Sequence, residues 1–82
     1  MKYIHELKCW ETPFEASIER LKTAEFRLND RGFQVNDLII LQEYCPHTKK
    51  YTGREITAEI THIQEGFGIP KGYVMLSLRY VD

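Results

Sequence analysis

Apolar and polar side chains alternate from Arg54 to Ile63, and this pattern constrains the fold more than any other feature of the sequence. Ile56, Ala58 and Ile60 occupy one set of positions, and glutamates and threonines stand between them. Successive side chains of a β-strand point to opposite faces, so the segment should be a strand with one buried face. An 82-residue chain has room for one core, so we expect a single domain over residues 1–82.

Further segments have the length and pattern of strands. Leu38–Leu41 is a continuous apolar run, which predicts a central strand buried on both faces. A polar stretch with Pro46 and Gly53 predicts a hairpin loop over Cys45–Gly53, and four Gly and Pro residues predict a long loop over Glu65–Gly72. The other expected strands are Tyr3–Lys8, Ala24–Leu28 and Tyr73–Val81, the last of which should close the sheet.

One helix is expected over Pro13–Leu21. Thr12 can cap its first turn and Glu15 completes a capping box. Its predicted apolar face consists of Phe14, Ile18 and Leu21. An early helix followed by strands predicts a mainly β fold with one or two short helices (α+β). We expect a strongly curved sheet or small β-barrel that the helix plugs at an end or a face.

The charge of the chain limits the kinds of partner it can have. Hydrophobic residues make up 43% and charged residues 28% of the sequence, a balance typical of folded domains. The formal net charge is −1, whereas proteins that bind nucleic acid through bulk electrostatics carry a large positive charge. Any nucleic-acid role therefore requires a local basic cluster or a pocket for one nucleotide.

Location and cofactors follow from what the sequence lacks. The longest apolar run, Leu38–Leu41, is far shorter than a membrane span, and Met1–Lys8 has no apolar stretch typical of a secretory signal. We therefore expect a cytoplasmic protein in which Cys9 and Cys45 are free thiols. The His, Cys, Asp and Glu spacings fit no metal site, and we expect neither a metal nor a cofactor.

Four short motifs together resemble one known family. They are His5-Glu6-Leu7-Lys8, the segment Lys22–Arg31 with the pattern KxxExRxNDR, Gln34-Val35-Asn36-Asp37 and Tyr51-Thr52-Gly53-Arg54. In order and spacing they resemble a small bacterial and phage group of ASCH domains, within the PUA-like superfamily. The resemblance implies a PUA-like pseudo-barrel and RNA binding, with some relatives acting on modified nucleosides.

The chain departs from the family pattern at two glycine positions and at one catalytic position. Arg20 and Asn36 stand where glycines are usual; Asn36 can adopt a left-handed conformation, whereas Arg20 should end the helix differently. An amidohydrolase branch of the superfamily has a threonine nucleophile where this chain has Glu25. Thr23 lies two positions earlier, but the sequence gives it no activating base. Glu25 could instead act as a general base beside Lys22.

The candidate site centres on charged residues around Ala24–Leu28. Lys22 and Arg27 could hold a phosphate or a carbonyl oxygen, and Glu25 could accept hydrogen bonds from a base edge. The alternative is that Glu25 and Arg27 only form surface ion pairs. Further candidate ligand-binding residues are Asp30, Arg54, Lys8 and Tyr51.

Three functions follow, in order of preference. The first is a non-catalytic domain that binds RNA or a nucleotide in a cleft. The second is a hydrolase acting on a modified nucleoside, with Lys22 and Glu25 as its acid and base. The third is a protein-interaction module, which predicts an exposed apolar patch and a stable oligomer. The sequence leaves open the RNA or nucleotide recognised, the oligomeric state, and a chromosomal or phage origin.

Overall fold

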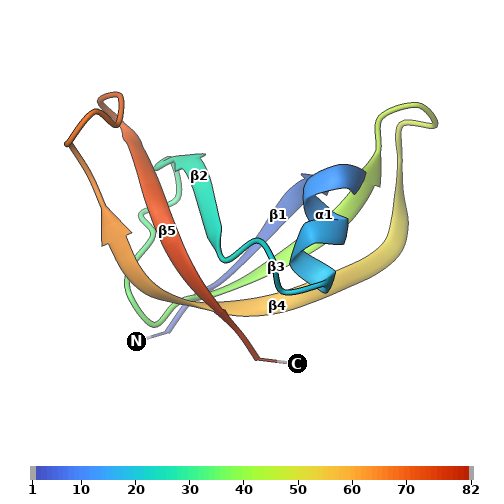
Figure 1. Cartoon of the computed structure of the whole chain (residues 1–82), viewed down its shortest axis with the longest axis horizontal. Coiled ribbons are helices and arrows are strands. Elements are labelled where there is room, and N and C mark those ends of the chain that lie inside the picture. Colours follow the sequence, from blue (N-terminus) through green and yellow to red (C-terminus); the bar gives the residue numbers. More distant parts are fainter. Residues whose placement is uncertain (1, 82) are drawn as a thin grey trace.

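The computed structural model of the chain describes residues 2–81 and has five strands and one helix (Figure 1). The strands are β1 (Ile4–Trp10), β2 (Ala24–Leu28), β3 (Leu38–Cys45), β4 (Lys50–Gln64) and β5 (Tyr73–Tyr80), and the helix is α1 (Glu11–Ile18). The strands form one sheet in the order β1-β3-β4-β5-β2. The β1–β3 pair is parallel and the other pairs are antiparallel. The predicted mainly β class with a short helix is confirmed.

The sheet curls into a half-barrel, with the long β4 as its floor and α1 inside the curl (Figure 1). The first half of β4 pairs with β3 and its last part with β5. The register shifts once in each pairing, between Gln42 and Tyr44 and between Ile60 and His62, and such bulges increase the bend of a strand. The concave face holds the core, whose largest fully buried side chains include Phe14, Leu7, Ile39, Leu41, Ile60 and Leu76.

The middle of the sheet differs from the prediction. The middle strand is β4 rather than the strand that begins at Leu38. Ile39 and Leu41 are fully buried, but Leu38 and Ile40 are only partly covered. The predicted burial on both faces is therefore wrong, because α1 covers the concave face of the sheet and nothing within residues 2–81 forms a second layer on the convex face.

The helix is shorter than predicted and is capped differently. It begins at Glu11 directly after β1, with extended Trp10 as its N-cap and no side-chain cap hydrogen bond, so the predicted Thr12–Glu15 capping box is absent. Pro13 falls within the first turn, where the N–H groups have no intrahelical partner. Phe14 and Ser17 face the sheet, whereas Leu21, predicted to pack inward, lies beyond the helix and is 76% exposed.

The helix ends in a Schellman motif formed without glycine. Arg20 adopts the left-handed conformation itself (φ 63°), contrary to the expectation that it would end the helix in another way. The Leu21 N–H donates to the Ala16 carbonyl at 2.9 Å and the Arg20 N–H to the Ser17 carbonyl at 3.0 Å. Asn36 is also left-handed (φ 81°), as the sequence allowed.

The half-barrel leaves β1 and β2 as edge strands, and arginine side chains bridge the seam between them. Arg27 Nη2 donates to the Lys8 carbonyl at 2.7 Å, and Arg31 Nη1 donates to the Glu6 carbonyl at 2.9 Å. Carbonyls two residues apart in a strand point to the same edge. Guanidinium groups thus satisfy edge carbonyls of β1 that a sixth strand would otherwise bind.

Candidate functional site

The three central candidates meet on one wall of the open seam. Glu25 and Arg27 are two residues apart on β2 and point to the same face, as predicted. Lys22 lies in the connection from α1 to β2, and its backbone is held at both ends. Its N–H donates to the Ala16 carbonyl at 3.1 Å, and its carbonyl accepts the Tyr80 hydroxyl at 2.5 Å.

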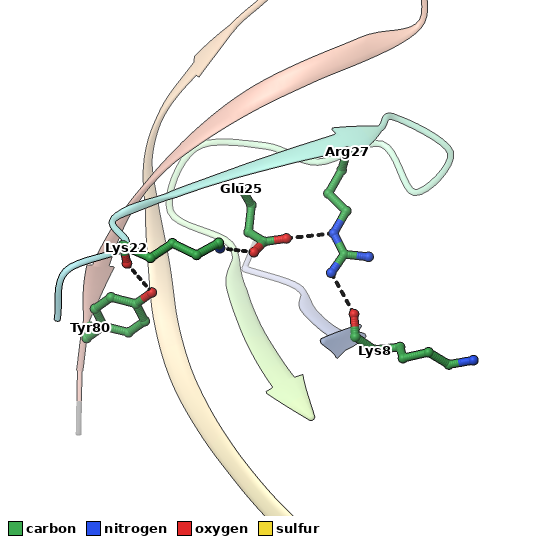
Figure 2. A network of polar contacts seen from close by, with 5 residues as sticks. All are labelled: Lys8, Lys22, Glu25, Arg27 and Tyr80. Carbon is green, nitrogen blue, oxygen red and sulfur yellow. Dashed lines mark hydrogen bonds and ion pairs between the residues drawn. The ribbon is translucent and has the colours of Figure 1, made fainter. Parts of the chain in front are cut away.

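Glu25 is a buried carboxylate held between two cations (Figure 2). Its side chain is 7% exposed, against 24% for Lys22 and 28% for Arg27. Lys22 Nζ contacts Glu25 Oε1, and Arg27 Nε donates to Oε2 at 2.7 Å. The ion pairs of the predicted alternative are therefore present, but the carboxylate that they share is almost completely buried, and each cation is only partly exposed. Glu25 therefore orients the two positively charged groups that a ligand can reach.

A pocket of about 440 Å³ opens beside this cluster. Such a volume is within the range of small-ligand sites. Its lining combines charged side chains with apolar and aromatic ones, a combination that suits a planar polar molecule. The lining residues are Lys8, Cys9, Trp10, Pro13, Lys22, Glu25, Phe26 and Arg27.

The cysteine in the pocket is not an activated nucleophile. Cys9 is 4% exposed, and burial raises the pKa of its thiol, with the nearby Glu25 carboxylate adding to the effect. Lys22 and Arg27 lower the pKa, but they do not outweigh burial. At neutral pH Cys9 is therefore a protonated thiol, whereas attack or metal binding requires the thiolate. Cys9 and Cys45 are free, and no group of three metal-ligating side chains occurs within residues 2–81.

The structure brings only part of the predicted site together. Lys8 contributes its carbonyl to the cluster and lines the pocket, while its side chain points away (Figure 2). Asp30 is exposed in the connection between β2 and β3. Arg54 and Tyr51 lie on β4, outside the pocket lining.

Arg54 belongs to a second polar cluster, around buried Glu43. Arg54 Nη1 donates to Glu15 Oε1 at 3.0 Å and lies 3.7 Å from Glu43 Oε1. Thr52 also donates to Glu43, at 2.7 Å, and the Arg54 guanidinium lies 5.2 Å from the centroid of the Phe14 ring. These contacts tie α1 to the β3–β4 hairpin, so Arg54 has a bridging role in the fold.

Sequence reasoning missed the aromatic residues of the pocket, Trp10 and Phe26. The first strand was predicted to end at Lys8, which left Trp10 outside every expected element and outside the candidate site. Phe26 alternates with Glu25 and Arg27, and this spacing placed it on the other face. It reaches the pocket because β2 is an edge strand, beside which the described part of the chain places no further strand. Only the edge position of β2, which the sequence did not reveal, would have indicated this.

These features define a small, curled β half-barrel domain with a charged pocket at its seam. The chain belongs to the family described as "Domain of unknown function (DUF3850)", which matches residues 4–78. It is similar to a protein of Escherichia phage P2, described as "Uncharacterized 12.9 kDa protein in GpA 3'region". The two are 36% identical over 76 residues, which cover 93% of this chain and 68% of the phage protein. Across residues 2–81, no helix is long and apolar enough to span a bilayer.

Proposed function

We propose that this domain binds RNA or a nucleotide, and that the seam pocket holds one nucleotide unit. The observation that carries the proposal is the buried Glu25 carboxylate that fixes Lys22 and Arg27 on the charged wall of the pocket. The resemblance of the motifs to RNA-binding ASCH domains of PUA-like fold supports the same reading. The DUF3850 family and its phage relative are compatible with a small phage-related module.

The chemistry of the pocket matches the parts of a nucleotide. Trp10 and Phe26 offer aromatic surface to a base, and stacking on such surface tolerates any base. A guanidinium has five N–H donors, and Glu25 and the Lys8 carbonyl engage only two nitrogens of Arg27. Arg27 can therefore donate to a phosphate or a carbonyl oxygen while it keeps both contacts. Glu25 retains lone pairs that can accept a hydrogen bond from the amino group of a base.

Removal of the two cations tests this function. In the variant K22Q/R27Q we expect at least a tenfold loss of affinity for nucleoside monophosphates and short single-stranded RNAs, because each substitution removes a charge-assisted contact to the ligand. Heteronuclear NMR titration of the labelled domain would give both the affinity and the residues that shift. The matched control, K71Q/R79Q, removes the same charges from the β4–β5 loop and β5, outside the pocket lining.

Thermal unfolding of both double variants separates lost binding from lost folding. Unchanged affinity in a folded K22Q/R27Q variant, or no binding by the wild-type domain at millimolar nucleotide, would refute the proposed pocket.

A hydrolase acting on a modified nucleoside is the second candidate. The observation in its favour is the contact between Lys22 Nζ and Glu25 Oε1 at the wall of a ligand-sized pocket. Such a pair could exchange a proton with a bound water or leaving group. Cys9 is a protonated thiol, so the reaction would use water rather than a thiolate nucleophile. Incubation with acylated nucleosides at high protein concentration, followed by chromatography, would reveal product or eliminate this candidate.

A protein-interaction module is the third candidate, and the convex face of the β2–β5 pair favours it. Phe26 and Tyr73 stack there with ring centroids 5.2 Å apart, and both rings are exposed, 50% and 37% respectively. Leu28, opposite Tyr73 in the register, is 49% exposed. Sedimentation equilibrium tests this candidate: a monomer at all concentrations would count against self-association through these residues.

A further inference from the structure

Three aromatic residues lie in one row across three neighbouring strands. In the sheet register Trp10 of β1 is opposite Tyr44 of β3, and Tyr44 is opposite Tyr51 of β4. Residues opposite each other in a sheet project to the same face. Glu43, next to Tyr44, is buried on the concave side, so this aromatic row (Trp10, Tyr44 and Tyr51) lies on the convex face.

The contacts within the aromatic row leave its two end rings accessible. Tyr44 packs edge to face against Tyr51, with centroids 5.2 Å apart and planes at 73°. Lys8 Nζ lies over the Tyr44 ring, 4.2 Å from its centroid. The central ring is thus used in packing and holds a cation, whereas Trp10 and Tyr51 are 57% and 54% exposed. Two strand spacings, about 10 Å in total, separate them.

The aromatic row continues from the seam pocket. Trp10 belongs to both the pocket lining and the row, and Lys8 lines the pocket and lies next to the row. We propose that the row is a track for single-stranded nucleic acid leading out of the pocket. Trp10 and Tyr51 stack two bases, and Lys8 binds a phosphate between them. This inference rests on the proposed function, since it names the ligand class as an extended single strand rather than a free nucleotide.

The charges around the aromatic row favour binding of a nucleic-acid strand at this end of the sheet. The neighbouring row consists of Lys8, Gln42 and Glu55, and Glu6 lies one further step along β1. Glu6 and Glu55 would repel phosphates bound nearer the middle of the convex face. Lys8 belongs to the neighbouring row, but its Nζ lies over the Tyr44 ring, and it is the cation that we assign to a phosphate. A local contact of this kind suits a chain of net charge −1, in which bulk attraction is absent.

A single substitution separates the aromatic row from the pocket. Tyr51 lies outside the pocket lining. We therefore expect Y51A to lower the affinity for a single-stranded RNA hexamer about five- to 100-fold and to leave the affinity for a nucleoside monophosphate unchanged. Fluorescence anisotropy of a labelled hexamer and competition by the monophosphate would measure both affinities. The matched control is F67A, which removes a 93% exposed aromatic ring from the β4–β5 loop.

Two further readouts test the roles of Trp10 and Lys8. Trp10 is the only tryptophan of the chain, so a base stacked on it should quench the intrinsic fluorescence. K8Q should reduce the slope of log affinity against log salt by about 0.7, the value for one phosphate contact of a single strand. The same slope for K8Q and the wild-type protein would overturn the phosphate contact.

The outcomes distinguish the aromatic row from the pocket. If the hexamer binds no more tightly than the monophosphate, or if Y51A binds it like the wild-type protein, the row is refuted and the pocket stands. If Y51A lowers the affinity for the hexamer but the monophosphate does not bind at all, the row is supported and the proposed pocket is wrong. If neither ligand binds, both proposals are wrong, and the third candidate, a protein-interaction module, becomes the one to test.

Discussion

At the scale of single residues, Asp37 is the polar centre that joins the beginnings of β1 and β3. Its side chain is 1% exposed, and its Oδ1 accepts the Tyr3 N–H at 3.2 Å. Its Oδ2 accepts the Gln34 N–H at 3.1 Å and lies 2.9 Å from His5 Nε2. The histidine of the first motif is therefore a structural partner, packed edge to face on Phe33, and lies outside the pocket lining.

The environment of Asp37 predicts an acid-sensitive step in stability. Burial alone would raise the pKa of this carboxyl, but the hydrogen bonds from His5, Tyr3 and Gln34 outweigh burial and hold the pKa below its ordinary value of 3.8. A lowered folded-state pKa means that the stabilisation is present above pH 3.8 and is lost as the pH falls through the folded-state value. We expect D37N to lose about 1–3 kcal/mol of unfolding free energy at pH 7.

Urea unfolding between pH 7 and pH 2.5 checks this prediction. The difference between wild type and D37N should shrink as the pH falls below 3.8, because the wild-type carboxylate becomes protonated. D30N is the control, since Asp30 is exposed in a loop. A difference that stays constant over the whole range would show that the charge of Asp37 is not the cause.

At the scale of elements, the seam between β1 and β2 should depend on Arg31. Its hydrogen bond to the Glu6 carbonyl connects the loop after β2 to the edge of β1. R31M keeps an extended apolar side chain and removes this bond, so we expect a loss of about 0.5–1.5 kcal/mol in unfolding free energy by urea titration. R79M is the control, because Arg79 pairs with Glu59 on adjacent strands and bridges no seam. Equal losses in the two variants would contradict a specific role for the seam.

The sequence predicted some strand bounds well and missed others: the strand expected over Arg54–Ile63 begins at Lys50, inside the hairpin loop expected over Cys45–Gly53. β2 was predicted with its observed bounds, and the loop over Glu65–Gly72 and the last strand were predicted to within one residue. The helix was predicted less well, because its ends depend on β1 running directly into it and on the left-handed Arg20. Neither feature follows from side-chain capping rules.

The candidate site was predictable only where its residues are close in the sequence. Lys22, Glu25 and Arg27 lie together because strand periodicity fixes the last two and the helix end fixes the first. Arg54 and Tyr51 were grouped with them by motif, but the length and curvature of β4 decide where they lie. The aromatic row needs the pairing of three strands, two of them parallel, and no local pattern specifies that register.

At the scale of the whole molecule, the placement of charge restricts which nucleic acids can bind. The chain carries a formal net charge of −1, and the cations of the proposed ligand path are Lys8, Lys22 and Arg27. Duplex binders gain most of their non-specific affinity by neutralising many phosphates. A pocket for one nucleotide and a stacking row require bases that are already unpaired, since the stacking faces in a duplex are covered.

We therefore predict that the domain discriminates strongly against duplexes. At 150 mM salt a 20-base-pair duplex should bind more weakly than about 10⁻⁴ M, the weak end of non-specific binding. A single strand of the same length should bind at least ten times more tightly, through base stacking that a duplex cannot provide. Anisotropy titrations of labelled single-stranded and duplex forms measure this ratio. Equal affinities that fall in parallel with salt would place the binding on phosphates alone, and the aromatic row and pocket would then have no part in it.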